Sequence, residues 1–63
     1  SADDLFIMKA FAARPKDWLD AETIAVRQKG RLNTVRILEH LAELSELKAE
    51  PEILLRARKI LER

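Results

Sequence analysis

The sequence predicts an all-α fold, a four-helix arrangement, from three observations. Glycine and proline are nearly absent, with one Gly and two Pro among 63 residues, so few positions interrupt regular structure. Helix-forming residues dominate the remainder, and no stretch has the alternating pattern of a strand. The few interruptions, at Pro15, Gly30 and Pro51, divide the chain into four segments of helical length. Residues 1–63 therefore make a single small helical domain or subdomain.

The first helix is expected from about Asp3 to Ala13. Ser1 with Asp4 three residues later resembles a capping box, with Asp in place of Glu. Pro15 ends the helix, because the residue before a proline avoids the helical region. The large apolar side chains of this segment point in every direction around the helix, and such a helix needs cover on every side. They are Leu5, Phe6, Ile7, Met8 and Phe11.

The chain also begins without Met, directly at a helix cap, and ends inside its last predicted helix at Arg63. Together with the uncovered first helix, these ends lead us to expect a fragment of a larger chain or an obligate oligomer. In the second case, self-association would use the helix at residues 3–13.

The second helix is expected from about Lys16 to Lys29, because Gly30 is a typical residue just past a helix C-terminus. The third is expected to begin at a cap on Asn33 or Thr34 and to run to about Lys48. The fourth is expected to start near Pro51, a good first-turn residue, and to continue to the chain end. The third and fourth helices have apolar residues on one arc only, as surface helices do.

Composition excludes several classes of function. Twelve Lys and Arg against eleven Asp and Glu give a net charge of +1, which implies no strongly charged partner. Without Cys no thiolate metal site is expected, and with His40 as the only His no protein-only zinc site is expected. The longest apolar runs have four residues, so no membrane span or signal peptide is expected. The lack of Cys suits a cytoplasmic protein.

Five charged residues gather around the start of the second helix: Lys9, Arg14, Lys16, Asp17 and Asp20. Free N–H groups and the helix dipole favour anions at a helix start, and the three cations add positive charge there. The cluster therefore suits a phosphate. Asp17 and Asp20 are three residues apart on one helix face, where one could accept a proton or orient a nucleophile. The structural alternative is a lysine that extends to solvent and two acids that offset the helix dipole.

The spacing Lys-x-x-Ala-x-Arg-x-Lys-Asp-x-x-Asp, from Lys9 to Asp20, resembles the C-terminal signature of a nucleotidyltransferase family. This family is the bacterial abortive-infection, AbiEii-type group, and many of its members are toxins of toxin–antitoxin systems. The resemblance extends from Asp3 to about Gln28. It implies that the chain is the helical C-terminal part of a nucleotidyltransferase-like protein.

The resemblance also implies roles for the charged cluster. Lys9 would contact the phosphates of the nucleotide, with Arg14 and Lys16 in support, and Asp17 and Asp20 would complete the catalytic site. The parent protein would use an NTP and Mg²⁺, held in a polymerase-beta-like N-terminal core with a Gly-Ser turn and two metal-binding acids. This chain has no Gly-Ser dipeptide and no Asp-x-Asp pair. We therefore expect no cofactor or nucleotide transfer from this chain alone, and a missing N-terminal core as its partner.

Two functions of other classes compete with this hypothesis. One is a structural module, a helical bundle that dimerises through its first helix, in which the charged cluster only caps helices. The other is a helix-turn-helix DNA-binding module around Gly30, with basic residues near its turn: Arg27, Lys29, Arg31 and Arg36. Acidic residues on the third helix would repel DNA phosphates, so nucleic-acid binding is not expected for this segment alone. They are Glu39, Glu43 and Glu46.

Overall fold

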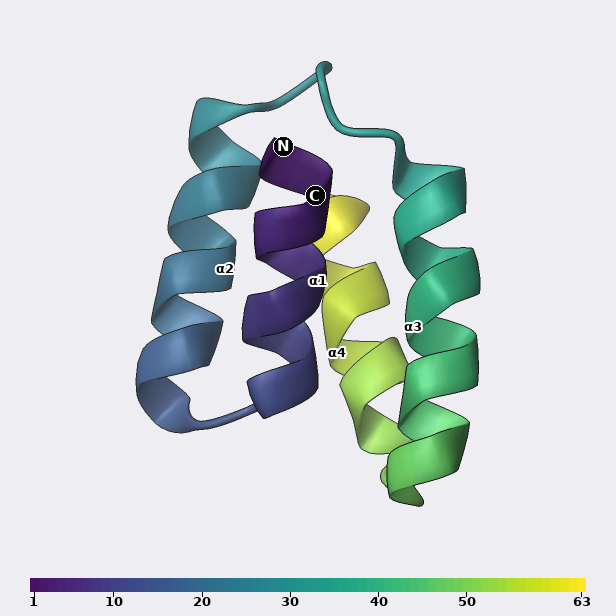
Figure 1. The fold of residues 1–63 in the computed structure, drawn as a ribbon. Coiled ribbons are helices and arrows are strands. Elements are labelled where there is room, and N and C mark those ends of the chain that lie inside the picture. The colour runs from purple at the N-terminus through teal and green to yellow at the C-terminus, as the bar shows by residue number, and fades with distance from the viewer.

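The computed structural model describes all 63 residues and confirms the all-α prediction. Four helices follow one another without any strand: α1 (Ala2–Ala12), α2 (Pro15–Arg27), α3 (Thr34–Lys48) and α4 (Glu52–Leu61). In Figure 1, α1 lies between α2 and α3, and α4 packs behind it. Contacts between the helices agree with this view, because α1 touches each of the other three. No helix has both the length and the apolar character that a membrane span requires.

The turn between α1 and α2 is short because two neighbouring residues leave the helical region. Ala13 adopts a left-handed conformation with φ 59°, and its N–H donates to the Lys9 carbonyl at 3.1 Å. Arg14 is extended, with φ −77° and ψ 157°, as expected before Pro15. Helix α1 therefore ends at Ala12, one residue earlier than predicted, and α2 begins at Pro15.

The other helix ends follow the predicted signals with small shifts. The Ser1 hydroxyl accepts from the Asp4 N–H at 3.2 Å, which confirms the cap of α1. Helix α2 ends at Arg27 rather than Lys29, and the chain turns through Gly30 at φ 83°. Asn33 is the cap of α3, since its side-chain oxygen accepts from the Arg36 N–H at 3.1 Å. Helix α4 ends at Leu61, before the last two residues.

The core lies where the four helices meet. Its largest fully buried side chains are Phe6, Ile37, Leu41 and Ile53, from α1, α3 and α4. Helix α2 contributes Trp18 and Ala21, which are also buried. Each helix therefore has one face in a common core, and this core fixes how α1 and α2 lie against each other.

Helix α1 is covered on only part of its surface. Phe6, Ile7 and Ala10 are buried, whereas Leu5 is 45% exposed and Met8 is 66% exposed. Helices α2 and α3 flank α1 and α4 lies behind it (Figure 1), so the three neighbours contact α1 without enclosing it. The outer face of α1, with Leu5 and Met8, is open to solvent in the single chain.

Candidate functional site

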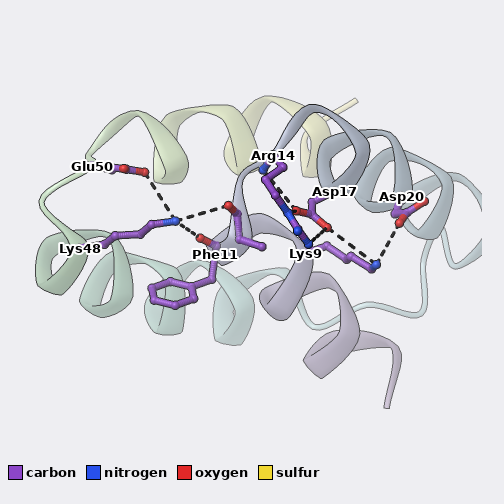
Figure 2. Close-up of polar contacts among 8 residues, drawn as sticks. Lys9, Phe11, Arg14, Asp17, Asp20, Lys48 and Glu50 are labelled. Atoms are coloured by element: carbon purple, nitrogen blue, oxygen red, sulfur yellow. Dashed lines mark hydrogen bonds and ion pairs between the residues drawn. The ribbon is translucent and has the colours of Figure 1, made fainter.

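The α1–α2 hairpin brings Lys9 and two acids together, as Figure 2 shows. The Lys9 ammonium nitrogen Nζ lies 2.9 Å from Asp20 Oδ2 and 3.9 Å from Asp17 Oδ1. The short turn at Ala13 and Arg14 causes this contact, because it places the last turn of α1 beside the first turns of α2. The structure therefore places these three predicted site residues in one charged cluster.

Asp17 is enclosed and held by Arg14. Its side chain is only 4% exposed, and its Oδ2 accepts from Arg14 Nε at 2.7 Å and from the Arg14 backbone N–H at 3.3 Å. Arg14 Nη2 also donates to Asp17 Oδ1 at 3.4 Å. The backbone contact is the acid half of a capping box at the start of α2. Asp17 thus joins the helix cap to the charged cluster.

These contacts set the protonation state of Asp17. The hydrogen bond from the Arg14 side chain lowers the pKa of the Asp17 carboxyl, and burial opposes this effect. The Arg14 backbone N–H and the charges of Arg14 and Lys9 lower the pKa further. A carboxylate with a lowered pKa and occupied oxygens is a weak proton acceptor near neutral pH. The geometry therefore favours a positioning role for Asp17 over proton transfer.

Asp20 and Lys9 form the solvent-facing part of the cluster. The Asp20 side chain is 41% exposed and the Lys9 side chain is 32% exposed, so small ions can reach both. Lys9 thus extends from an otherwise apolar helix to water, while its charge is held by two carboxylates. A lysine in this setting combines access from solvent with a restricted position.

The two remaining cations differ in how they relate to the cluster. The Arg14 side chain is 77% exposed but is anchored on Asp17. Lys16 is exposed on the first turn of α2 and forms no ion pair, although it lies one turn before Asp20. The structure therefore joins four of the five predicted site residues and leaves Lys16 beside them as an unpaired charge.

Two cations of α3, Lys48 and Arg36, make contacts with a distant part of the chain that had no signal in the sequence. Lys48, at the end of α3, donates through Nζ to the carbonyls of Phe11 and Ala12, and it stacks 4.9 Å from the centre of the Phe11 ring. Figure 2 shows this contact, with Glu50 3.7 Å from the same ammonium. Lys48 thus caps the C-terminus of another helix, 37 residues away, so its role depends on the packing of α3 against α1.

Arg36 is the second of these cations. It lies 3.2 Å from Asp3 and 3.0 Å from Asp4, at the start of α1. This residue was a candidate phosphate contact in the helix-turn-helix hypothesis, but both acids already engage it. The arrangement therefore weakens the case for a DNA-binding face at the α2–α3 turn.

The charged cluster lies on an open surface. The largest surface hollow, about 610 Å³, lies between α2 and α4 and is lined by residues such as Trp18, Arg56 and Lys59. None of the five cluster residues lines it. No group of three or more His, Asp or Glu side chains converges anywhere in the chain. The cluster can thus present cations to an anion, but it does not enclose a nucleotide.

Comparison with known proteins gave no relatives. No protein-family model matches the chain, and no curated protein or solved structure matches it either.

Proposed function

We propose that this chain is the helical portion of a nucleotidyltransferase and supplies phosphate-contacting cations to an active site completed by another part of the parent protein. One observation carries the proposal: Lys9 is held by two carboxylates of α2 within the Lys9–Asp20 motif that resembles the nucleotidyltransferase signature. The parent would be a cytoplasmic enzyme that uses an NTP.

The physical support is the restriction placed on Lys9. A free lysine side chain loses rotamer entropy when it binds an anion, and this loss weakens binding. Lys9 has already lost part of that freedom, because Asp17 and Asp20 hold its ammonium from one side. Its partial exposure leaves room for a phosphate oxygen to approach from solvent.

The other residues of the cluster support Lys9 in different ways. Arg14 fixes Asp17, and Asp17 in turn holds Lys9, so both position the phosphate-binding lysine. Lys16 adds an unpaired positive charge one turn from Asp20, which favours an anion on this surface. Asp20 is the acid with solvent access, so its contact with Lys9 lies where an anionic substrate would approach.

The Mg²⁺ that accompanies the NTP does not fit the residues of this chain. Asp17 and Asp20 are engaged by cations, and no third ligand lies beside them. The metal would require the acids of the nucleotidyltransferase core, and that core is the partner we propose for this segment.

The first prediction tests phosphate binding by the 63-residue chain itself. Inorganic tripolyphosphate should shift the NMR signals of Lys9, Lys16 and the first turn of α2, with weak affinity because few contacts are made. Replacing Lys9 by Gln should reduce the affinity at least about tenfold, since a charge-assisted contact contributes roughly 1.5–3 kcal/mol.

The matched control is Lys59→Gln, which removes the charge of an exposed, unpaired lysine on α4. This variant should bind tripolyphosphate as the unsubstituted chain does. If Lys9→Gln also binds normally, or if the shifts spread evenly over all lysines, Lys9 is not a phosphate site and the proposal fails.

A second candidate function is favoured by the open face of α1. Leu5 and Met8 are exposed there beside the partly exposed Phe11, as a helix that packs against a partner would require. On this hypothesis the chain is a helical module that self-associates through residues 3–13, and Arg14, Asp17 and Lys9 only stabilise the hairpin. The mass of the chain in solution, with and without the Met8→Ala substitution, tests this hypothesis.

A further inference from the structure

The two carboxylates that share Lys9 differ in their freedom to move. Three hydrogen bonds from Arg14 fix Asp17, and its side chain is almost fully buried. Asp20 has Lys9 as its single ion-pair partner, and 41% of its side chain is exposed. An anion that approaches Lys9 from solvent can therefore displace Asp20 but not Asp17.

We infer that Asp20 occupies the phosphate position on Lys9 in the free chain and leaves it when a polyphosphate binds. This inference rests on the proposed function, in which Lys9 receives the phosphate. The exchange breaks no covalent bond and moves no proton. Lys9 keeps its charge and its contact with Asp17, while one ion-pair partner replaces another.

Charge balance supports an exchange over simple addition. Lys9 and Arg14 are matched by Asp17 and Asp20, so the four side chains together carry no net charge. A phosphate added beside an unmoved Asp20 would place a third anion on one ammonium, and the repulsion between the phosphate and Asp20 would oppose binding. Movement of Asp20 into solvent removes that repulsion, and its exposure allows the movement.

The strength of the Lys9–Asp20 contact permits this exchange. A solvent-exposed ion pair changes an equilibrium constant by a factor of roughly 1.4 to 5. A triphosphate carries several negative charges and can also interact with the unpaired Lys16, so it can displace one carboxylate. A ligand with a single negative charge has no such advantage. Asp20 thus makes the surface selective for polyphosphates over simple carboxylates.

The second prediction is that Asp20→Asn tightens tripolyphosphate binding roughly three- to tenfold, because it removes both the competitor for Lys9 and the repulsion. The affinity is measured by NMR titration of the 63-residue chain at fixed ionic strength. In the unsubstituted chain, saturation with tripolyphosphate should also move the carboxyl ¹³C signal of Asp20 to that of a free carboxylate. A purely structural role for Asp20 would give neither result.

The matched control is Glu22→Gln. Glu22 lies on the same helix, its side chain is 32% exposed, and it pairs with Arg63 at 2.8 Å. Its replacement changes the net charge by the same amount but leaves Lys9 untouched. The affinity for tripolyphosphate should therefore change less than twofold, because one exposed ion pair has a small effect. Asp20→Ser serves as a second variant if Asp20→Asn does not give a native-like spectrum.

The outcomes separate this inference from the proposed function. If Lys9→Gln abolishes binding but Asp20→Asn leaves it unchanged, or if Glu22→Gln tightens it equally, Asp20 is no competitor and only this inference is overturned. If Lys9→Gln binds tripolyphosphate as the unsubstituted chain does, or if the unsubstituted chain does not bind it, the proposed function and this inference fail together.

Discussion

Asp17 is the only buried acid of the chain, and its contacts explain why it stays charged. The Arg14 side chain donates to both of its oxygens, and the Arg14 N–H donates to one of them. The sequence placed Asp17 on one helix face with Asp20 and allowed either acid–base chemistry or a helix cap. The structure distinguishes the two acids: Asp17 is buried and hydrogen-bonded to Arg14, whereas Asp20 is partly exposed. This difference in exposure depends on the fold of the hairpin and not on the spacing of the two acids in the sequence.

The third prediction follows from the lowered pKa values of Asp17 and Asp4. Arg14 stabilises the charged form of Asp17, and Arg36, then Ser1, stabilise that of Asp4. Both pKa values lie below 3.8 in the folded chain, so these carboxylates stabilise the fold at neutral pH. That contribution should disappear as the pH falls through and below 3.8, because the unfolded chain then binds protons more readily.

Urea unfolding at a series of pH values measures this effect. Asp17→Asn should have a smaller loss of unfolding free energy on acidification than the unsubstituted chain, because one of the two responsible groups is gone. Asp4→Asn is the matched variant and should also flatten the profile. Identical profiles for Asp17→Asn and the unsubstituted chain would show that the Arg14–Asp17 contact does not stabilise the fold.

Helices α1 and α3 are each followed by an alanine with positive φ, 59° at Ala13 and 58° at Ala49. Glycine is the preferred residue there, because a Cβ atom disfavours the left-handed region by about 1 kcal/mol. The sequence signal for a helix end was therefore weak, and the first helix was predicted one residue too long. The hydrogen bond from the Glu50 N–H to the Ser45 carbonyl, at 2.9 Å, still closes the end of α3.

The fourth prediction is that Ala49→Gly stabilises the fold. Ala49 is exposed and lies in the left-handed region, so glycine should raise the free energy of unfolding by about 0.5–1 kcal/mol. Ala42→Gly, the same substitution within α3, should lower it by about 1 kcal/mol. Thermal and urea unfolding of the two variants provides the measurement. Destabilisation by both substitutions would show that Ala49 is not in a left-handed conformation.

Helix α1 is the centre of the molecule, and its two faces have different surroundings. Its inner face contacts α2, α3 and α4 in a shared core, and its outer face exposes Leu5 and Met8. The sequence showed a helix that is apolar on all sides and led us to expect complete cover. The three neighbours leave the outer face open, so any cover there must come from outside these 63 residues.

The fifth prediction compares the two faces. Leu41 is fully buried, so Leu41→Ala should lower the free energy of unfolding by about 2–5 kcal/mol. Met8 is exposed, and Met8→Ala should change it by less than about 0.5 kcal/mol in a monomer. If the chain self-associates through α1, Met8→Ala should instead lower the melting temperature in a concentration-dependent way.

Sedimentation equilibrium of the unsubstituted chain and of Met8→Ala completes this test. A monomeric mass at every concentration, together with a neutral Met8→Ala, would contradict the oligomerisation hypothesis. A dimer that Met8→Ala dissociates would support it.

The four helices and most of their caps could be inferred from residue order alone, because they depend on contacts within three or four neighbouring residues. Ser1, Pro15, Gly30 and Asn33 act in this way. Even the grouping of Lys9 with Asp20 could be anticipated, since a short turn separates them.

Packing between helices decided the rest. It buried Asp17, left Asp20 in solvent, and brought Lys48 to the end of α1 and Arg36 to its start. The contacts of Lys48 and Arg36 join helices that are distant in the sequence. Residue order cannot determine them, because they depend on where the shared core places each helix.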